Sequence, residues 1–323
     1  MADAVALDGW SAGDVRLGTV LDTLAELRRS VARTASRVWV MTLVIVAITD
    51  DEAYQALQAV RSLGVHHPAR VLVLRPDPAS AGPAGVDAQV TLYGAGDGDH
   101  QLTFDEVVLT VRGEASAHLD SIAEPFTLSD LPVVLWYPAT PPDASDPLLT
   151  TASAVLVDTK DQVDLSGLAA TVCPRPVIDM SWMRLRPWRS VVAALFDPPG
   201  FRPYVTRLTS IEVAGKGGPR HLLAGWLSSR LSFGADRIRL RDARHAGVVL
   251  EAGDAARFAV TRATGERVVR ASASISGGPT HHALLPLPDD SLVWSLSQAL
   301  THLGRDPVWE EALAAAVKLA DHS

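Results

Sequence analysis

The sequence of 323 residues contains a single cysteine, Cys173. One cysteine excludes an intrachain disulfide and an all-cysteine metal cage, and it is typical of the reducing cytosol. Long hydrophobic runs are also missing, since the longest, VWVMTLVIVAI, spans only residues 38–48 and a membrane helix needs about 20 apolar residues. The amino terminus, MADAVALDGW, is acidic and does not resemble a signal peptide. We therefore predict a cytoplasmic protein without a membrane segment.

Positive charge is scarce. The chain has 29 lysine and arginine residues against 37 aspartate and glutamate residues, a formal net charge of −8. This balance does not favour binding to nucleic acid or to an anionic membrane. The hydrophobic content of 47% and charged content of 20% are those of an ordinary globular protein. The length allows two domains, each with its own core.

The first half of the chain predicts alternating helices and parallel strands. Apolar residues recur at helical spacing over 15–32, and the run at 38–48 predicts a strand buried on both faces. Thr49 and Glu52 have the spacing of a capping box at the start of the next helix. A second apolar run at 70–74 completes a βαβ unit, which predicts parallel pairing, and Pro76 is expected to end that strand.

Four further strands and a helix over Glu114–Ala123 are predicted in this half. The strands are Ala88–Tyr93, Val107–Val111, Val133–Tyr137 and Ala154–Asp158. Together these elements predict a three-layer, Rossmann-like α/β domain over residues 1–172. The composition shifts near Cys173, so we assign residues 173–323 to a second domain.

The second half predicts an α+β domain. A strand at 207–213 is followed by a glycine turn at 215–218 and a helix over Pro219–Leu231. Short alternating segments then predict antiparallel strands. These segments are Arg237–Arg241, Gly247–Glu251, Arg257–Arg262 and Val268–Ile275. Asp306 and Pro307 mark the start of the last helix.

The Rossmann-like half lacks a dinucleotide motif. Its first βα turn, AITDDEA at 47–53, has no glycine and three acidic residues, which would repel a pyrophosphate from the helix N-terminus. The segment GAGDGD at 94–99 lacks the third glycine of G-x-G-x-x-G. We therefore predict no bound dinucleotide and no other cofactor.

Catalytic and metal motifs are also missing. The histidine pairs at 66–67 and 281–282 are adjacent in sequence, and neighbours in extended chain point to opposite faces. No metal is therefore predicted. No Gly-x-Ser-x-Gly elbow and no nucleophile–base pair is recognisable, so we predict a protein that is not an enzyme.

The stretch DMSWMRLRPWR at 179–189 is one candidate for partner binding. Pro187 predicts that a helix begins there and that the chain before it is extended. Extended chain would direct Trp182, Arg184 and Arg186 to one side, while Trp188 joins the apolar face of the helix. Tryptophan and arginine are enriched at binding hot spots. We predict contacts from Trp182, Arg184, Arg186 and Arg189, with internal packing as the alternative.

A second candidate is the segment 230–270, which has nine arginines against five acidic residues. Arg237, Arg239 and Arg241 alternate with apolar residues, which predicts that all three lie on one face of a strand. The functional interpretation is docking onto an acidic partner surface. The alternatives are a solvated sheet face and an RNA-binding module.

The turn GKGGPRH at 215–221 offers a different kind of site. Backbone N–H groups at a helix start, flanked by Lys216 and Arg220, could hold a phosphate. The turn is not a P-loop, because Gly217 follows the lysine where that motif requires serine or threonine. An enzyme or sensor that binds a sugar phosphate or nucleotide at 215–218 therefore stands beside the interpretation as a flexible turn.

Four segments, in this order, resemble the OpcA family of glucose-6-phosphate dehydrogenase assembly proteins. They are HPARVLVL at 67–74, SDLPVVLWYP at 129–138, DMSWMRLRPWR at 179–189 and HLLAGWLSSRL at 221–231. The resemblance implies a non-catalytic protein that binds glucose-6-phosphate dehydrogenase and promotes its oligomeric assembly and activity in the oxidative pentose phosphate pathway. It provides no catalytic residues to transfer. The redox control through paired cysteines that it implies for cyanobacterial relatives does not extend to a chain with one cysteine.

Overall fold

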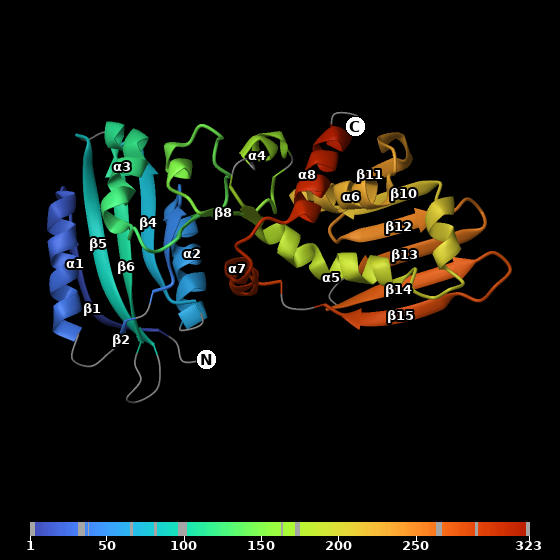
Figure 1. Cartoon of the computed structure of the whole chain (residues 1–323), viewed down its shortest axis with the longest axis horizontal. Helices are drawn as coiled ribbons and strands as arrows, with labels where there is room; N and C mark the ends of the chain where they lie inside the picture. Colours follow the sequence, from blue (N-terminus) through green and yellow to red (C-terminus); the bar gives the residue numbers. More distant parts are fainter. Residues whose placement is uncertain are drawn as a thin grey trace. The chain divides into compact units, whose positions relative to one another are not determined.

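The structure is a computed structural model that describes residues 4–31, 36–37, 39–64, 67–80, 83–95, 102–162, 164–171, 175–262, 267–287 and 290–320. Cys173 and most of the segment 94–99 lie outside these residues. The chain divides into two compact units (Figure 1). The first unit comprises Met1–Asp158, Cys173–Ile178 and Leu292–Gly304; the second comprises Thr159–Val172, Asp179–Ser291 and Arg305–Ser323. The two domains with the bounds 1–172 and 173–323 remain a prediction.

A mixed sheet of nine strands is the centre of the first unit (Figure 1). Its order is β1-β5-β6-β4-β3-β7-β8-β9, and β2 pairs with β6. The strands are β1 (Val5–Ala12), β2 (Ser36–Arg37), β3 (Met41–Val46), β4 (Ala69–Asp77), β5 (Gly85–Ala95), β6 (Leu102–Arg112), β7 (Val133–Tyr137), β8 (Ala154–Val157) and β9 (Val177–Asp179). The pairings of β3 with β4 and with β7 are parallel, as the βαβ pattern predicts. The pairings of β5 with β1 and with β6 are antiparallel.

The parallel strands at the middle of this sheet are buried on both faces. Every residue of β3, β7 and β8 is buried, which confirms the buried strand predicted from the apolar run at 38–48. The α/β class is therefore confirmed, whereas the Rossmann-like, three-layer arrangement remains a prediction. β1 was not predicted, because its side chains are mostly exposed and its sequence, VALDGWSA, has no apolar alternation.

The helices of the first unit include the predicted capping box. The elements are α1 (Leu17–Val31), α2 (Asp50–Leu63), the 3₁₀ helices η2 (Gly113–His118), η3 (Glu124–Phe126) and η4 (Pro147–Thr150), α3 (Leu119–Ala123) and α7 (Leu292–Thr301). At the start of α2 the Glu52 N–H donates to Thr49 Oγ1 at 3.2 Å. Glu52 Oε2 accepts from the Ile48 N–H at 2.8 Å, so the Glu52 side chain reaches back to the residue before the cap and not to Thr49 itself. The helix predicted over Glu114–Ala123 is 3₁₀ in its first half.

Pro76 does not end β4, contrary to the prediction from sequence. β4 continues through Pro76 to Asp77, where Pro76 lies opposite Val111 of β6. The pairing with β3 stops at Leu74. Pro76 therefore lies beyond the last β3 hydrogen bond, where a missing N–H leaves no partner in β3 unsatisfied.

The second unit is built on a six-stranded sheet of order β11-β10-β12-β13-β14-β15. The strands are β10 (Ser210–Gly215), β11 (Ile238–Asp242), β12 (Gly247–Glu251), β13 (Ala256–Arg262), β14 (Val268–Ile275) and β15 (His281–Pro286). Four of the five pairings are antiparallel, as predicted. The pairing of β10 with β11 is parallel, because α6 connects them as a crossover, and the antiparallel prediction is wrong there. The edge strand β15 was not predicted.

The helical elements of the second unit are α4 (Ser166–Thr171), α5 (Met180–Ala194), η5 (Arg202–Arg207), α6 (Gly217–Leu231), η6 (Ala235–Arg237) and α8 (Pro307–Ala320). α6 packs closely on α8 at Gly225, where an added Cβ would lie 2.1 Å from the Ala312 carbonyl oxygen. Asp306 caps α8 as predicted, since its Oδ1 accepts from the N–H groups of Val308 and Trp309. Within the described parts of the chain, no helix has the length and apolar content to cross a bilayer.

Candidate partner-binding surface

The stretch 179–189 is helical throughout, which overturns the prediction of extended chain before Pro187. α5 begins at Met180, because Asp179 acts as its N-cap and accepts from the Ser181 N–H at 2.8 Å. Pro187 lies inside the helix, where it removes one backbone hydrogen bond. Burial of side chains on both sides of the proline, including Trp182 and Trp188, offsets that loss.

Trp182 belongs to the core of the second unit and not to its surface. Its side chain is 1% exposed, and its indole N–H donates to Asp306 Oδ2 at 2.7 Å. The Arg189 guanidinium lies over the Trp182 ring, 3.4 Å from the ring centroid. Burial lowers the pKa of Arg189 to about 10. These two residues join α5 to the start of α8, so the interpretation of Trp182 as partner-facing is wrong.

Arg184 does not share one face with Trp182 and Arg186, contrary to the prediction from extended chain. Residues two apart on a helix point in different directions. Arg184 is half-buried and donates to Ser181 Oγ at 3.2 Å. Arg186 is the exposed arginine of α5. Trp188 is buried, as predicted from the helical pattern.

The three arginines near β11 are exposed, but only two of them belong to the strand. Arg239 and Arg241 lie in β11, two residues apart and therefore on one face. Arg237 belongs to η6, and its guanidinium lies 3.9 Å from the centroid of the Phe233 ring. The prediction of one arginine face thus holds for Arg239 and Arg241 and fails for Arg237, because the strand begins at Ile238.

The sheet of the second unit has one covered face. Its buried strand residues alternate along the sequence and face each other across the pairings: Ile211, Val213, Val248, Leu250, Phe258, Val260, Val269, Ala271 and Ala273. Rings from the segment after α5 pack here, with Phe196 and Phe201 at 4.7 and 5.7 Å from Phe258 between centroids. His281 of β15 contacts Phe201 at 5.4 Å on the same face.

The opposite face, which we call the open face, has a different composition. The register aligns Arg239, Glu212, Val249, Ala259, Ser272 and His282 in one row across the six strands. The next row aligns Arg241, Ala214, Gly247, Thr261, Arg270 and Leu284. Ala214 and Ala259 in the middle strands are small and buried, and Arg239 and Arg241 lie on the edge strand β11.

Charges on the open face are partly paired. Arg241 Nε lies 2.7 Å from Glu212 Oε1, and Arg257 Nε lies 3.4 Å from Glu251 Oε1. Arg239, Arg241, Arg257 and Arg270 are all exposed on this face. Exposed ion pairs of this kind contribute at most about 1 kcal/mol to stability.

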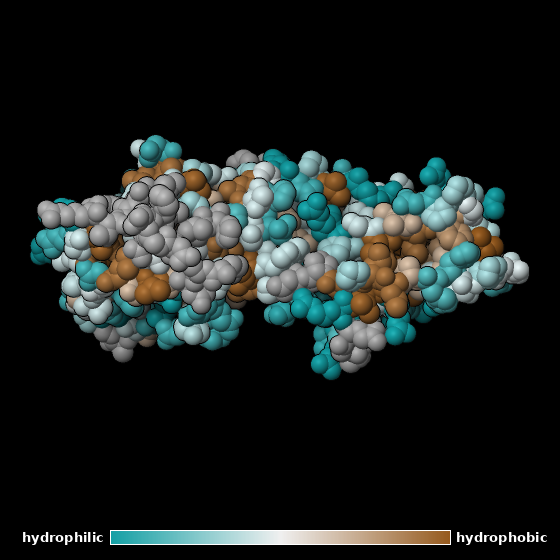
Figure 2. All heavy atoms as spheres, turned by 90° about the horizontal axis from the view of Figure 1, so that it is seen from below, coloured by the Kyte–Doolittle hydropathy of each residue, from teal (hydrophilic) through white to brown (hydrophobic). Residues whose placement is uncertain are grey.

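β15 adds exposed apolar surface at the edge of the sheet. All six of its residues are exposed, and Leu284, at 68%, is the most exposed large hydrophobic side chain of the described residues. Figure 2 shows apolar side chains on the surface of the second unit on the side of β14 and β15. An uncovered, apolar edge strand beside arginines has the composition of a protein-binding surface.

The glycine turn before α6 is explained by packing. The Gly218 N–H donates to the Thr159 carbonyl oxygen at 3.2 Å. An added Cβ would lie 2.2 Å from the Lys160 carbonyl oxygen at Gly217 and 2.3 Å from that of Thr159 at Gly218. The glycines permit this close approach of two backbones, and one of the N–H groups that could cradle a phosphate is already used.

Among the residues that the structure describes, no group of three or more histidine, cysteine, aspartate or glutamate side chains is arranged to hold a metal ion. His281 and His282 lie on opposite faces of β15, as predicted for neighbours in a strand, whereas His66 lies outside the described residues.

Comparisons with known proteins agree with the two-part organisation of the chain. Residues 60–171 match the family described as the N-terminal domain of the "Glucose-6-phosphate dehydrogenase subunit". Residues 175–313 match the family described as the C-terminal domain of the same protein. A Synechocystis protein named "Putative OxPP cycle protein OpcA" is 27% identical over 186 residues, which cover 53% of this chain and 39% of that protein. The chain thus matches well under half of that relative's length.

Proposed function

This chain belongs to the family of glucose-6-phosphate dehydrogenase subunits, and we propose that it is a non-catalytic, cytoplasmic partner that binds glucose-6-phosphate dehydrogenase and promotes its oligomeric assembly and activity. Both halves of the chain match models of that family. No catalytic pair was recognisable in the sequence, and the one glycine-rich turn with basic neighbours is explained by packing.

The observation that carries the proposal is the open face of the second unit. We propose that Arg239, Arg241, Arg257 and Arg270 contact carboxylates of the dehydrogenase, and that Leu284 supplies apolar contact at the edge. Arginine gives directional, bidentate pairing with carboxylates. Trp182 and Arg189, which are buried together, have a structural role instead, and Arg237 has no place in the strand.

The test measures dehydrogenase activity and sedimentation while increasing amounts of the chain are added. The chain alone should not reduce NADP with glucose 6-phosphate, whereas its addition should raise the rate and shift the dehydrogenase to a larger species. Turnover by the chain alone, or an effect that follows added RNA and not the dehydrogenase, would contradict the proposal.

Two matched double variants locate the interface. Arg239→Ala with Arg270→Ala should weaken dehydrogenase binding about thirtyfold, the equivalent of about 2 kcal/mol for hot-spot residues. The control, Arg186→Ala with Arg202→Ala, removes the same charge from exposed arginines of helical elements. Its affinity for the dehydrogenase should remain within about threefold of that of the parent. Equal loss in both double variants would show that overall charge, and not the open face, determines binding.

A further inference from the structure

A pocket of about 300 Å³ lies in the first unit, at the carboxyl ends of its parallel strands. It is lined by residues at the ends of three strands, Val46 of β3, Pro76 of β4 and Tyr137 of β7, and by residues of the loops and helices that follow them. Its volume is at the lower end of the range for small-molecule sites. We call it the strand-end pocket.

The topology of the sheet gives this position significance. β3 pairs with β4 on one side and with β7 on the other, and the chain leaves β3 toward β4 and later returns to β7. In open parallel sheets, ligands bind outside the carboxyl ends of the strands where successive connections diverge in this way. The strand-end pocket lies at that point, between the ends of β3 and β7.

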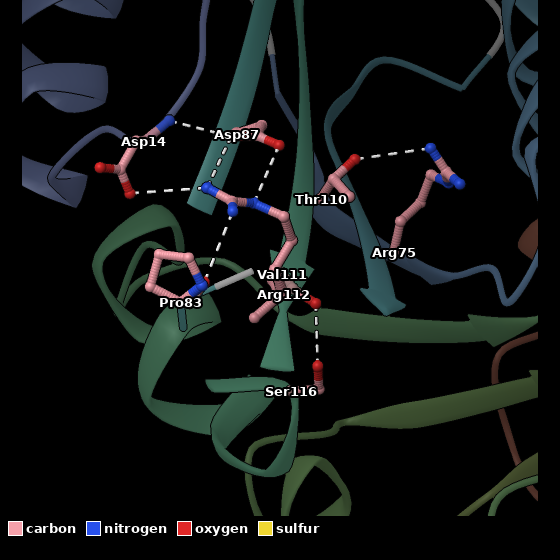
Figure 3. Close-up of polar contacts among 8 residues, drawn as sticks. All are labelled: Asp14, Arg75, Pro83, Asp87, Thr110, Val111, Arg112 and Ser116. Atoms are coloured by element: carbon pink, nitrogen blue, oxygen red, sulfur yellow. Dashed lines mark hydrogen bonds and ion pairs between the residues drawn. The ribbon is translucent and has the colours of Figure 1, made fainter. Parts of the chain in front are cut away.

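The pocket does not suit an anion. Glu52 and Asp146 line it, and no lysine, arginine or histidine is among its lining residues. Arg75, next to Pro76, pairs with Asp50 at 2.5 Å, and its guanidinium lies 3.5 Å from Thr110 Oγ1 (Figure 3). The first turn of α2 carries three acidic residues, Asp50, Asp51 and Glu52. A dinucleotide pyrophosphate would therefore meet negative charge here and no positively charged lining residue.

Two hydroxyl groups that line the pocket donate their hydrogens to other groups of the protein. Ser116 donates its hydroxyl hydrogen to the Val111 carbonyl oxygen at 2.8 Å (Figure 3), and Tyr137 donates its own to Asp146 Oδ2 at 2.8 Å. Burial raises the pKa of Tyr137, so the phenol stays protonated and remains this donor. Both hydroxyl oxygens keep lone pairs that can accept a hydrogen bond. The carboxylates of Glu52 and Asp146 accept from the N–H groups of Ile48 and Leu148 and also retain lone pairs.

The remaining lining residues are apolar except for Thr140. Ile48, Leu119, Pro141 and Pro142, together with Val46 and Pro76, surround the polar groups. Such walls accept an aliphatic chain but offer it no hydrogen bond. A fitting ligand combines an apolar stem with a head that has many donors and a positive charge.

We propose that the strand-end pocket binds an alkyl guanidinium or alkyl ammonium group, with its cationic head at Glu52 and Asp146. A guanidinium has five N–H donors and no acceptor, which complements a pocket that offers lone pairs and negative charge. The group belongs either to a free small molecule or to an arginine or lysine side chain of a partner protein.

N-acetyl-arginine amide is the probe, because it has the cationic side chain without a free carboxylate. Calorimetric titration of the full chain should show saturable binding at one site. The neutral isostere N-acetyl-citrulline amide should bind at least about tenfold more weakly, since hydrogen bonds between charged groups are the stronger ones. Equal binding of both compounds, or no saturation by the arginine compound at millimolar concentration, overturns the proposal.

Two double variants with equal charge test the position of the site. Glu52→Gln with Asp146→Asn removes both carboxylates from the pocket and should weaken binding of the probe tenfold or more. The control, Asp51→Asn with Asp143→Asn, neutralises exposed neighbours in the same two segments that do not line the pocket, and should stay within twofold. Equal weakening in both overturns the proposal, because a general negative field would then explain the binding.

Folding of the first double variant is checked by its melting temperature. If it unfolds, Glu52→Gln alone serves, because glutamine keeps an oxygen that can accept from the Ile48 N–H. Adding the probe to the dehydrogenase mixture then distinguishes the two sources of the cation. Competition by the probe identifies a partner side chain, and an unchanged complex identifies a free small molecule. The titrations use the chain alone, so they do not depend on the proposed dehydrogenase binding.

Discussion

The two compact units differ in charge and in the covering of their sheets. The first unit has 21 acidic and 10 basic residues, a net charge of −11, whereas the second has 16 acidic and 19 basic residues, a net charge of +3. The middle strands of the first sheet are buried on both faces, but the second sheet leaves one face open. The net charge of the whole chain is the sum over two units of opposite net charge and is therefore a poor guide to its partners.

The difference assigns different roles to charged residues in the two units. In the first unit, Asp105 is 1% exposed and its carboxylate is bonded by Arg28, with the Arg70 Nε at 3.9 Å. Burial, and then the nearby Arg28, lower the pKa of Arg70 to about 10. On the open face, the Arg241–Glu212 pair is largely in solvent. The charges are buried in the first case, and in the second they belong to the surface that we propose binds the dehydrogenase.

The largest effect is expected from breaking the buried cluster. Asp105→Ala leaves the buried Arg70 and its neighbour Arg28 without their anion and should lower the free energy of unfolding by about 3–5 kcal/mol. Glu212→Ala should change it by less than about 1 kcal/mol. Denaturant unfolding measures both. Similar losses of unfolding free energy in the two variants would show that the buried charges stabilise the fold no more than the exposed ones do.

A second contrast lies within α5. Trp182→Ala removes a buried indole and its bond to Asp306, and should lower the free energy of unfolding by about 3–5 kcal/mol. Arg186→Ala changes an exposed side chain four residues further along α5. Its free energy of unfolding should stay within about 0.5 kcal/mol of that of the parent. Thermal melting and denaturant unfolding are the measurements. A stable Trp182→Ala variant with impaired dehydrogenase binding would restore this stretch as an interface.

A smaller, pH-dependent effect should distinguish the buried side of the second unit from its open face. Burial, and then Arg220, lower the pKa of His221, whose Nε2 lies 3.3 Å from Arg220 Nη2. The unfolded chain therefore binds a proton more readily, so stability should fall as pH drops below about 6.5, by at most about 1.4 kcal/mol per pH unit. His221→Gln should flatten this dependence between pH 5 and 7.

His282→Gln, on the open face, is the control and should retain the parent's pH profile. Unfolding free energies across that pH range decide the matter, and identical profiles for the parent and His221→Gln would show that this histidine does not contribute.

No effect at all is expected from dinucleotides. Titration with NAD or NADP should give no saturable heat at millimolar concentration, because the strand-end pocket is lined by acidic side chains and by no basic one. Binding of either compound to the isolated chain at micromolar concentration would mean that the first unit has an anion site elsewhere.

Sequence patterns identified most of the elements because local signals dominate there. The capping box at Thr49 and the strand Val133–Tyr137 follow from neighbours in the sequence. The start of α5 does not follow from neighbours in the sequence. A proline normally begins a helix, and the burial of Trp182, which overrides this tendency, depends on Asp306, far along the chain. β15 is exposed throughout and therefore lacks a hydrophobic pattern.

The candidate site was predictable only in part. Arg239 and Arg241 stand out by their spacing in a single strand. Arg270 and Leu284 face each other only through the β14–β15 register, and the row that connects them to Arg241 passes through three more strands. Register between strands depends on turns and on burial across the whole sheet, which a single sequence does not provide. The strand-end pocket was missed for the same reason, because its lining comes from several separate segments.

The return of α7 to the first unit affects how the protein emerges from the ribosome. α7 packs against α2, and Ser297 lies 3.2 Å from His67, although residues 179–291 of the second unit are synthesised in between. At a translation rate of about 5–20 residues per second, the surface of α2 that packs against α7 stays uncovered for several seconds after its synthesis. Nascent chains would thus expose this surface to chaperones until the carboxyl-terminal segment is made, and a gene fragment ending before Leu292 would never cover it.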